Sequence, residues 1–248
     1  MNVLGIIPSR YASTRFPGKP LTIIHGKSMI QRVFEQALKA SLVMDVVVAT
    51  DDDRIKNEVE GFGGKVIMTS DQHSSGTDRC QEVVEKFEKA GVHYNVVVNI
   101  QGDEPYINPL QIDEVVSCFE NQDVQIATLI KKISTLQELL SPNVNKVVFN
   151  HRNEAIYFSR HPIPYFQNLD QTQWLSNHIY FKHIGIYGYR TDILKEITQL
   201  EKSKLEIAES LEQLRWLNNG YRINVLITEL ESFSVDTPDD LSKFLNKS

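Results

Sequence analysis

The chain has 248 residues and a formal net charge of −6, and 41% of its residues are hydrophobic. This acidic balance excludes a general nucleic-acid binder, because such proteins gain most of their affinity from clustered lysine and arginine. The two cysteines, Cys80 and Cys118, lie far apart and indicate neither a zinc site nor a disulfide framework, which fits a cytoplasmic protein. We expect one compact domain without a signal peptide or a membrane span.

The first half of the chain alternates short apolar runs with amphipathic segments. Residues 3–7 are typical of a strand buried on both faces, and residues 29–40 place apolar side chains at helical spacing. The predicted strands of this half are 3–7, 46–49, 65–68 and 96–100, and the predicted helices are 29–40, 52–60, 78–90 and 109–119. This βαβ rhythm predicts a parallel, doubly wound sheet.

Beyond residue 120 the pattern changes, and strands follow one another with little helix between them. The predicted strands here are 125–132, 146–149, 155–158, 180–189 and 222–228. Residues 159–176 are rich in proline and polar groups and predict a flexible or partner-facing excursion. One long helix is predicted over 204–218, with Ile207 on its apolar stripe and Gly220 at its end. A final helix begins at Thr237-Pro238. We therefore expect an α/β fold whose later sheet is mixed.

A cationic loop follows the first predicted strand. Residues 8–21 contain Arg10, Arg15 and Lys19 together with small hydroxyl residues, Gly18 and three prolines, so they form neither a helix nor a central strand. A buried strand that leads into such a loop places it at the edge of the sheet where α/β proteins bind ligands. Its cations and backbone N–H groups would neutralise a triphosphate. The alternative is a solvated, weakly basic loop.

Two carboxylates have settings that suit a hard cation. Asp103 follows a strand and lies beside Gly102, and Asp236 lies at a turn before the final helix. Mg²⁺ is usually held by one or two carboxylates plus substrate phosphates, so this pair would complement the cationic loop. For Asp236 an ordinary turn role is the slightly stronger alternative. Residues 51–53 contain Asp-x-Asp, which some glycosyltransferases use to hold a metal, but three acids at a helix start favour capping.

Other polar residues have structural alternatives of similar weight. Alternation along a strand places His183 and Tyr187 on one face, where they would border a ligand or form a satisfied, semi-buried cluster. Glu212 and Gln213 would ordinarily be solvated surface, and Arg160 would be a loop cation. The residues alone leave these alternatives open.

Taken together, the motifs resemble those of the 3-deoxy-manno-octulosonate cytidylyltransferases, from residue 3 to the final helix. Departures are mild: Ser9 stands where the family often has alanine, and neither His161-Pro162 nor residues 165–178 match a family pattern. The motifs occur in the family's order, as Arg-Tyr-Ala-Ser-Thr-Arg-Phe-Pro-Gly-Lys-Pro-Leu at 10–21, Val-Ala-Thr-Asp at 48–51, Ser-Gly-Thr-Asp-Arg at 75–79, Gln-Gly-Asp-Glu-Pro at 101–105, Tyr-Phe-Ser-Arg at 157–160, His-Ile-Gly-Ile-Tyr-Gly-Tyr-Arg at 183–190, Leu-Glu-Gln-Leu-Arg at 211–215 and Val-Asp-Thr-Pro-Asp at 235–239.

The resemblance implies a three-layer nucleotidyltransferase fold with a mostly parallel central sheet and a smaller mixed lobe for dimerisation and sugar binding. It implies one cytidylyltransferase domain over 1–248, with a CTP-binding core at about 1–130 and 215–248 and a sugar and dimer lobe at about 131–214. The family's enzymes are homodimers. The implied reaction transfers the cytidylyl group of CTP to 3-deoxy-D-manno-octulosonate (Kdo), giving CMP-Kdo and pyrophosphate for lipopolysaccharide biosynthesis.

Site residues are implied position by position. Arg10, Arg15 and Lys19 correspond to triphosphate ligands. Asp103 and Asp236 correspond to magnesium ligands, and with Lys19 and Arg10 they form the implied catalytic set. The implied cytidine positions are Ser75, Gly76, Thr77, Arg79 and Gln101, and the implied sugar-acid contacts are Arg160, His183, Tyr187, Glu212 and Gln213. Two alternatives remain: a cytidylyltransferase for a related acidic sugar, and a non-catalytic sugar-nucleotide sensor.

Overall fold

The strands of one large sheet are drawn from almost the whole chain. The structure, a computed structural model, describes residues 1–12 and 16–245. Within that part the sheet has nine strands, β1 (Val3–Pro8), β4 (Asp45–Thr50), β5 (Val66–Met68), β6 (Val96–Asn99), β7 (Ile126–Lys132), β8 (Lys146–Phe149), β9 (Ala155–Ser159), β10 (Phe181–Arg190) and β11 (Ile223–Ile227). Their order is β11-β7-β10-β6-β1-β4-β5, and β8 and β9 continue from β10.

The N-terminal half forms the parallel part of the sheet. β1 pairs in parallel with β4 and β6, and β4 pairs in parallel with β5. The apolar side chains of β1 are buried because helices cover both faces of the strand. The helices of this half are α1 (Met29–Ala37), α2 (Asp53–Gly61), α3 (Gly76–Lys89) and α4 (Pro109–Ser117). The four strands and four helices predicted here are confirmed, with small shifts at their ends.

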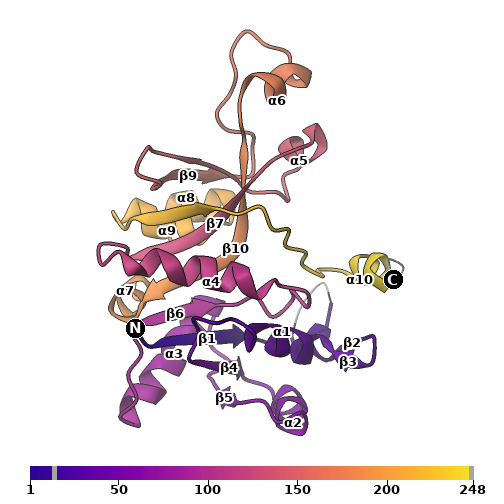
Figure 1. Cartoon of the computed structure of the whole chain (residues 1–248), viewed down its shortest axis with the longest axis vertical. Helices are drawn as coiled ribbons and strands as arrows, with labels where there is room; N and C mark the ends of the chain where they lie inside the picture. Colours follow the sequence, from indigo (N-terminus) through magenta and orange to yellow (C-terminus); the bar gives the residue numbers. More distant parts are fainter. Residues whose placement is uncertain (13–15, 246–248) are drawn as a thin grey trace.

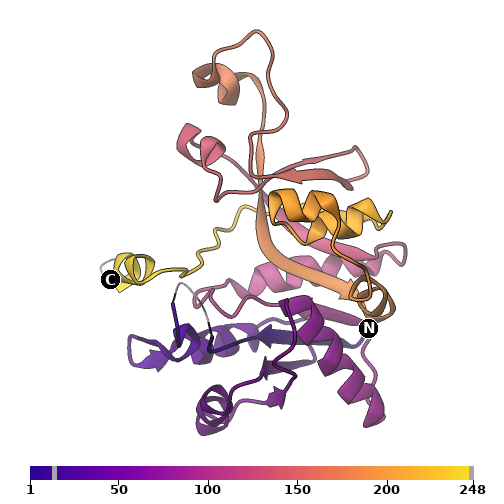
Figure 2. The same cartoon turned by 180° about the vertical axis from the view of Figure 1, so that it is seen from behind.

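Helices on both faces give the core its three layers. Side chains of α1, α2 and α4 pack on one face of the sheet. On the other face, α3 packs together with α7 (Thr191–Ile197) and α9 (Gln213–Asn218). Figure 1 shows α4 in front of the sheet, and Figure 2, from behind, shows α3 in front. The predicted three-layer α/β fold is confirmed, although the sequence did not predict α7.

The later strands make the sheet mixed, as predicted. β10 lies between β6 and β7 and is antiparallel to both, whereas β11 is parallel to β7. A bulge interrupts the pairing of β10 with β7 between Ile184 and Tyr187. Because β10 also pairs with β8 at its first residues, this one strand connects the core to the upper lobe (Figures 1 and 2).

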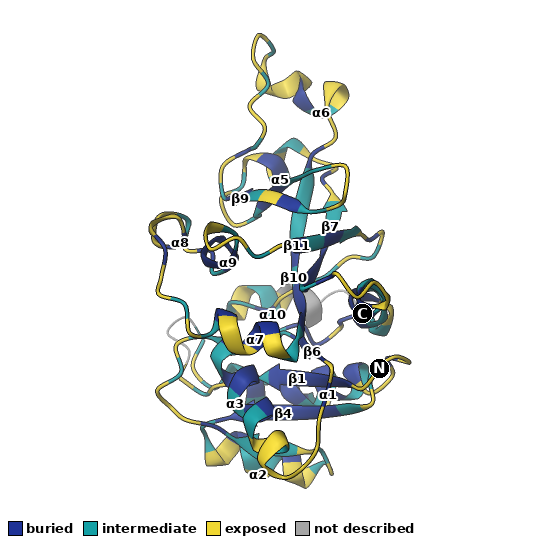
Figure 3. Cartoon of the chain, turned by 90° about the vertical axis from the view of Figure 1, so that its left-hand side faces the viewer, coloured by how far each residue is buried: buried dark blue, intermediate teal, exposed yellow. Residues whose placement is uncertain are grey.

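The upper lobe contains β8, β9, α5 (Leu136–Leu140) and α6 (Trp174–Asn177), with the 3₁₀ turn η3 (Gln171–Gln173). Its small apolar cluster includes Leu139, Trp174 and Tyr180. Much of the segment between β9 and β10 is exposed and protrudes from the lobe (Figure 3). The predicted excursion at 159–176 lies in this segment, and its role toward a partner stays a prediction, as do the proposed lobe boundaries.

The single long helix predicted over 204–218 is wrong. The chain instead forms α8 (Lys204–Glu209) and α9, and Ser210 between them has a left-handed backbone with φ of 52°. An ion pair stabilises the bend, because the Arg215 guanidinium donates to both Glu206 carboxylate oxygens at 2.7 and 2.8 Å. Ile207, predicted on the apolar stripe, is 66% exposed. Gly220, with φ of 85°, does follow the end of α9.

An irregular strap, residues 228–237, returns the chain from β11 to the core. It leads to α10 (Pro238–Leu245), whose predicted start is confirmed. Val235 is fully buried against the start of α1 and the short hairpin of β2 (Ile23–Ile24) and β3 (Lys27–Ser28). Figure 1 shows the strap in yellow leading to α10 at the C-terminus. No helix of the described residues is long and apolar enough to cross a membrane.

Candidate active site

A cavity of about 410 Å³ lies where β1 and β6 end. These strands are parallel neighbours, so their carboxyl ends share one edge of the sheet, where α/β folds bind ligands. The predicted site residues that line this cavity are Arg10, Lys19, Ser75, Gly76, Arg79, Gln101, Asp103 and Asp236. The structure therefore brings together the predicted phosphate, cytidine and metal positions. Arg15 lies outside the described residues.

Lys19 joins the two predicted metal ligands. Its Nζ lies 2.7 Å from Asp103 Oδ2 and 3.4 Å from Asp236 Oδ1. Lys19 begins the 3₁₀ turn η1 (Lys19–Leu21), which follows Gly18 in a left-handed conformation with φ of 71°. The side chains of Lys19, Asp103 and Asp236 are 14%, 25% and 36% exposed. One ammonium thus neutralises part of the charge of two carboxylates from distant parts of the chain.

Close backbone packing sets the positions of these carboxylates. A Cβ on Gly102 would lie 2.9 Å from the Pro8 carbonyl oxygen, so only glycine lets the loop after β6 approach β1 this closely. The backbone N–H of Val235 donates to the Asp103 carbonyl at 2.9 Å. This bond and the burial of Val235 place the strap, and hence Asp236, beside the loop.

The carboxylate pair fits a magnesium ion that is also held by a substrate. Asp103 and Asp236 already converge on one cation, the Lys19 ammonium. No cluster of three or more His, Cys, Asp or Glu side chains within residues 1–12 and 16–245 could hold a metal. Two carboxylates completed by phosphate oxygens and water are a usual Mg²⁺ environment, whereas two alone leave most of its octahedral shell unfilled.

The N-terminus of α3 forms the opposite wall of the cavity. Ser75 is the N-cap, and a capping box with Asp78 fixes the first turn. A Cβ on Gly76 would lie 3.3 Å from the Pro8 side chain, so this turn packs tightly against the end of β1. The first N–H groups of a helix are free to bind acceptor groups of a ligand. Thr77 does not line the cavity, because its hydroxyl donates to Glu212 at 2.8 Å.

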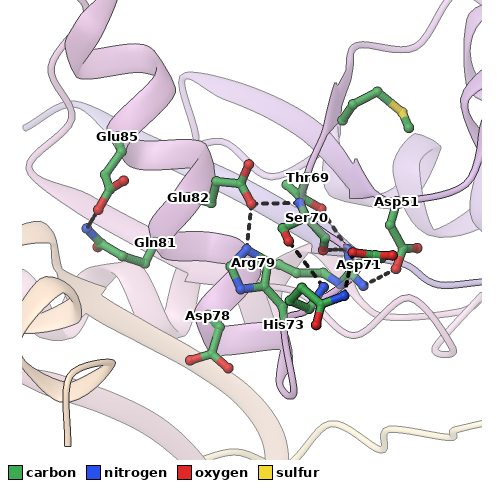
Figure 4. Close-up of polar contacts among 12 residues, drawn as sticks. Asp51, Thr69, Ser70, Asp71, His73, Asp78, Arg79, Gln81, Glu82 and Glu85 are labelled. Atoms are coloured by element: carbon green, nitrogen blue, oxygen red, sulfur yellow. Dashed lines mark hydrogen bonds and ion pairs between the residues drawn. The ribbon is translucent and has the colours of Figure 1, made fainter.

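Arg79 is almost completely buried, with a side chain 3% exposed. Its guanidinium donates to Asp51 at 2.5 Å and to Thr69 Oγ1 at 2.6 Å (Figure 4). The predicted capping role of residues 51–53 is therefore correct for Asp52, which accepts from the Arg54 N–H, but wrong for Asp51. A buried guanidinium needs a charged partner, and β4 supplies one at its end.

Glu82, one turn after Arg79 on α3, also contacts the loop before Ser75 (Figure 4). It accepts from the backbone N–H of Ser70 and contacts His73 and Lys86. Burial alone would raise the pKa of Glu82, but the hydrogen bonds from Lys86, Ser70 and His73 lower it to about 2. Arg79 and Glu82 together hold the loop that leads into Ser75.

His183 and Tyr187 lie in contact, as strand alternation predicted, with ring centroids 5.1 Å apart. His183 Nε2 lies 2.9 Å from the Thr128 hydroxyl, and its ring meets Phe158 edge-on. Burial lowers the pKa of His183 to about 3, so the imidazole is neutral at physiological pH. The buried Tyr187 hydroxyl has no hydrogen-bond partner among the described residues.

Glu212 and Gln213 are not solvated surface. Gln213 is 5% exposed, and Glu212 is half-buried. Burial raises the pKa of Glu212, although the hydrogen bond from Thr77 opposes this. Glu212 lines a second cavity of about 410 Å³, which shares Ser75 with the first. A residue that resembles surface by sequence is therefore placed beside the first cavity.

Arg160 is not brought to the first cavity. Its guanidinium donates to the carbonyls of Glu209, Pro142 and Ser210 at 2.6, 3.1 and 3.3 Å. It lines a separate cavity of about 470 Å³ in the upper lobe. Contact between Arg160 and a sugar carboxylate stays a prediction.

Sequence reasoning missed Asn99 as a residue of the first cavity and the burial of Glu104 next to Asp103. Asn99 is 4% exposed and lines the first cavity at the end of β6. A polar amide at the end of an otherwise apolar strand could have indicated that Asn99 faces a ligand site. Glu104 is buried, accepts from the Ser232 hydroxyl of the strap, and has a pKa raised by burial to about 7. Only the tertiary structure distinguishes it from an exposed loop acid.

Residues 4–223 match the family model described as cytidylyltransferase. This chain belongs to the cytidylyltransferase family. The 3-deoxy-manno-octulosonate cytidylyltransferase of Parabacteroides distasonis is 56% identical, over 99% of this chain and 97% of that protein. The enzyme of the same name from Bacteroides thetaiotaomicron is 55% identical, over 97% of this chain and 96% of that protein. The family resemblance predicted from the motifs, and the assignment as a nucleotidyltransferase, are confirmed.

Solved structures agree with this membership. A CMP:2-keto-3-deoxy-manno-octonic acid synthetase complexed with CTP superposes with a TM-score of 0.91 and 44% identity, covering 99% of this chain and 98% of that one. A cytidylyltransferase from Leptospira borgpetersenii has a TM-score of 0.63 at 15% identity, over 99% of this chain and 85% of that chain, which shows the fold alone. The predicted nucleotidyltransferase fold is thus confirmed.

Proposed function

We propose that this cytidylyltransferase transfers the cytidylyl group of CTP to Kdo, releasing pyrophosphate and forming CMP-Kdo for lipopolysaccharide biosynthesis. The observation that carries the proposal is the meeting of Lys19, Asp103 and Asp236 beside the first turn of α3 in one cavity. Relatives that are more than half identical over the whole chain are named for this sugar acid, and the solved neighbour is a complex with CTP.

The triphosphate would lie against the cationic side of the cavity. Arg10 is exposed and can turn toward phosphate oxygens, whereas Lys19 would exchange its carboxylate partners Asp103 and Asp236 for them. Arg15 is proposed to act with them. Their charge-assisted hydrogen bonds would strengthen as charge develops on the leaving pyrophosphate, which lowers the barrier.

The cytidine would lie against Ser75, Gly76 and Gln101. The free N–H groups of the first α3 turn and the Gln101 amide would provide hydrogen bonds to the base and ribose. The Arg79 guanidinium is held by Asp51, the Thr69 hydroxyl and the Ser70 carbonyl. The first turn of α3 is therefore ordered before the nucleotide binds. A preset wall loses little conformational entropy on binding.

We propose Mg²⁺ as the cofactor, held by Asp103 and Asp236 together with phosphate oxygens. When bound, it would polarise the α-phosphate and lower the pKa of the sugar hydroxyl. Asp103, fixed by the Gly102 approach, and Asp236, fixed by the strap, would keep two oxygens of the cation shell in place. Lys19 would hold the transferred phosphate in position for in-line attack.

The sugar acid would approach from the side of Glu212 and the β10 face. His183, neutral because of its lowered pKa, and Tyr187, Gln213 and Glu212 would bind its hydroxyl groups. Arg160 is proposed as the partner of its carboxylate. The anomeric 2-hydroxyl would attack the α-phosphorus directly. The new O–P bond forms as the bond from the α-phosphorus to the oxygen that bridges to the β-phosphate breaks, pyrophosphate leaves, and the hydroxyl proton passes to solvent.

We propose a cytoplasmic homodimer. The free Cys80 and Cys118 suit a reducing compartment. The segment between β9 and β10, which we call the extension, has exposed apolar side chains. Among them, Tyr165 is 71% exposed and Ile179 54% exposed, which supports a contact with a second copy of the chain.

The testing experiment measures pyrophosphate release from CTP and Mg²⁺ with a panel of 2-keto sugar acids. We expect Kdo to give the highest kcat/KM. A higher value with an amino-Kdo or a sialic acid would replace Kdo by that sugar. CTP binding without turnover on any sugar would favour a sugar-nucleotide sensor. For variants that remove a carboxylate of the proposed metal pair, the matched control is D239N, which removes an exposed carboxylate just after the strap.

A further inference from the structure

The Lys19 ammonium occupies the space between the two carboxylates that would hold the metal. Its Nζ is within hydrogen-bond reach of Asp103 and Asp236, and the three side chains come from η1, the loop after β6 and the strap. Pro20, in the same 3₁₀ turn, is buried, so the start of the lysine side chain is anchored. The ammonium therefore compensates a carboxylate pair whose members would otherwise repel each other.

A divalent cation on the same oxygens would lie close to this ammonium. Mg²⁺ binds carboxylate oxygens at about 2.1 Å, and the ammonium lies at hydrogen-bond distance from the same two groups. Like charges repel steeply at such separations, and a half-buried site screens them less than bulk water does. The carboxylate pair can therefore hold the ammonium or the metal, but not both in this arrangement.

The Lys19 ammonium can move to the proposed triphosphate position when a nucleotide binds. It lines the same cavity as Arg10 and the first turn of α3, where the triphosphate is proposed to lie. A lysine has a flexible four-carbon stem and a compact charge, so it can move to phosphate oxygens while its backbone stays in place. The same movement would free Asp103 and Asp236.

We propose that Lys19 is an internal competitor for the metal position, so that the carboxylate pair takes up a divalent cation only with or after the nucleotide. This inference rests on the proposed function, and it adds an order of binding to it. The two carboxylates stay paired with a cation at every stage: first with the ammonium, then with the metal that the phosphates help to hold. Free divalent cations do not occupy the site of the nucleotide-free protein.

The test measures Mn²⁺ binding without nucleotide, by the loss of the free Mn²⁺ signal in electron paramagnetic resonance. We expect K19M, which removes the charge and keeps the chain length, to bind Mn²⁺ at least roughly tenfold more tightly than the unaltered protein. K19R, which keeps a cation, should resemble the unaltered protein. In the double variant K19M/D103N the gain should vanish. Equal Mn²⁺ affinity in the unaltered protein and K19M would overturn the inference.

A second measurement needs no substitution. Mn²⁺ alone should leave the melting temperature of the unaltered protein unchanged, because a ligand stabilises only the state that it binds. A clear rise on adding Mn²⁺, abolished in D103N, would contradict the inference even if K19M failed to fold. Turnover of CTP and Kdo by the unaltered protein is measured in parallel. Its absence would overturn the proposed function, whereas normal turnover with metal binding first would overturn only the order of binding.

Discussion

At the scale of single residues, the site depends on partners that are distant in sequence. Lys19 meets Asp103 and Asp236, and Arg79 meets Asp51. Each pair places charge at an edge of the sheet where water is partly excluded, so each interaction is stronger there than on an open surface. Two predictions belong to this scale.

The first concerns Asp103. In D103N the amide keeps the size of the side chain but cannot compensate a divalent cation, so we expect kcat at saturating CTP to fall by about 10² or more. The melting curve should stay close to that of the unaltered protein, since Asp103 is only half-buried. D239N should keep normal turnover. Near-normal turnover in D103N would remove Asp103 from the proposed metal pair.

The second concerns the pH dependence of stability through His183. Its folded pKa is about 3, below the value of about 6.5 for an exposed histidine. The unfolded chain therefore binds the proton more readily between these values, and the stabilising contribution present above pH ~6.5 is lost as the pH falls toward 3.

The measurement is denaturant unfolding at a series of pH values for the unaltered protein and H183Q. The difference between their free energies of unfolding should shrink by up to about 1.4 kcal/mol per pH unit as the pH is lowered through this window. All other titrating groups are shared by the two proteins and cancel. Parallel pH profiles would show that His183 does not titrate differently in the two states.

At the scale of secondary structure, the break between α8 and α9 is the clearest departure from local pattern. Apolar spacing over 204–218 is compatible with one helix, but the Glu206–Arg215 pair and the left-handed Ser210 fold the segment back. The bend brings Glu212 into contact with Thr77 of α3, buries Gln213 and leaves Ile207 in solvent. A helix propensity is weak compared with a buried ion pair and the packing around it.

Ser210 provides the prediction at this scale. A non-glycine residue with φ of 52° is strained, so S210G should raise the free energy of unfolding by roughly 1 kcal/mol. The control is S210A, which removes the hydroxyl but keeps the Cβ and should give no such gain. Stabilisation is read from denaturant midpoints. A gain in S210A equal to that in S210G would assign the effect to the hydroxyl instead of the backbone.

At the scale of the whole molecule, two connections assemble the site. β10 runs antiparallel between β6 and β7 and extends to β8, so it joins the core to the upper lobe. The strap brings Asp236 back beside Asp103, pinned by Val235 and by the Ser232–Glu104 hydrogen bond. These two connections therefore bring residues from distant parts of the chain to one edge of the sheet.

The proposed homodimer is tested at this scale by light scattering after gel filtration. We expect a mass of twice the 28.4 kDa of one chain. A charge at the exposed Ile179 of the extension, I179E, should yield monomers, because burial of an unpaired carboxylate in an apolar contact is costly. M44E, at a residue of similar exposure outside the upper lobe, should remain dimeric. A monomeric unaltered protein would contradict the proposal.

The sequence by itself determined the α/β rhythm of the first half and the cationic loop after the first strand. Buried parallel strands are continuously apolar, and glycine and proline mark where the chain turns. Both features depend only on residues that are close together in the sequence. The position of Asp103 after a strand could be predicted for the same reason. The family motifs then decided between the open alternatives for residues such as Asp236 and His183 and added the cytidine positions.

Only the tertiary structure decided which of these residues meet. It paired Asp51 with Arg79, turned Glu212 toward Thr77, tied Arg160 to backbone carbonyls, and set Lys19 between Asp103 and Asp236. A local pattern indicates the apolar face of a regular element, but it did not give the burial of Gln213 or the exposure of Ile207. The partner it finds depends on strand order, a bend at Ser210 and the path of the strap, which arise from contacts between distant parts of the chain.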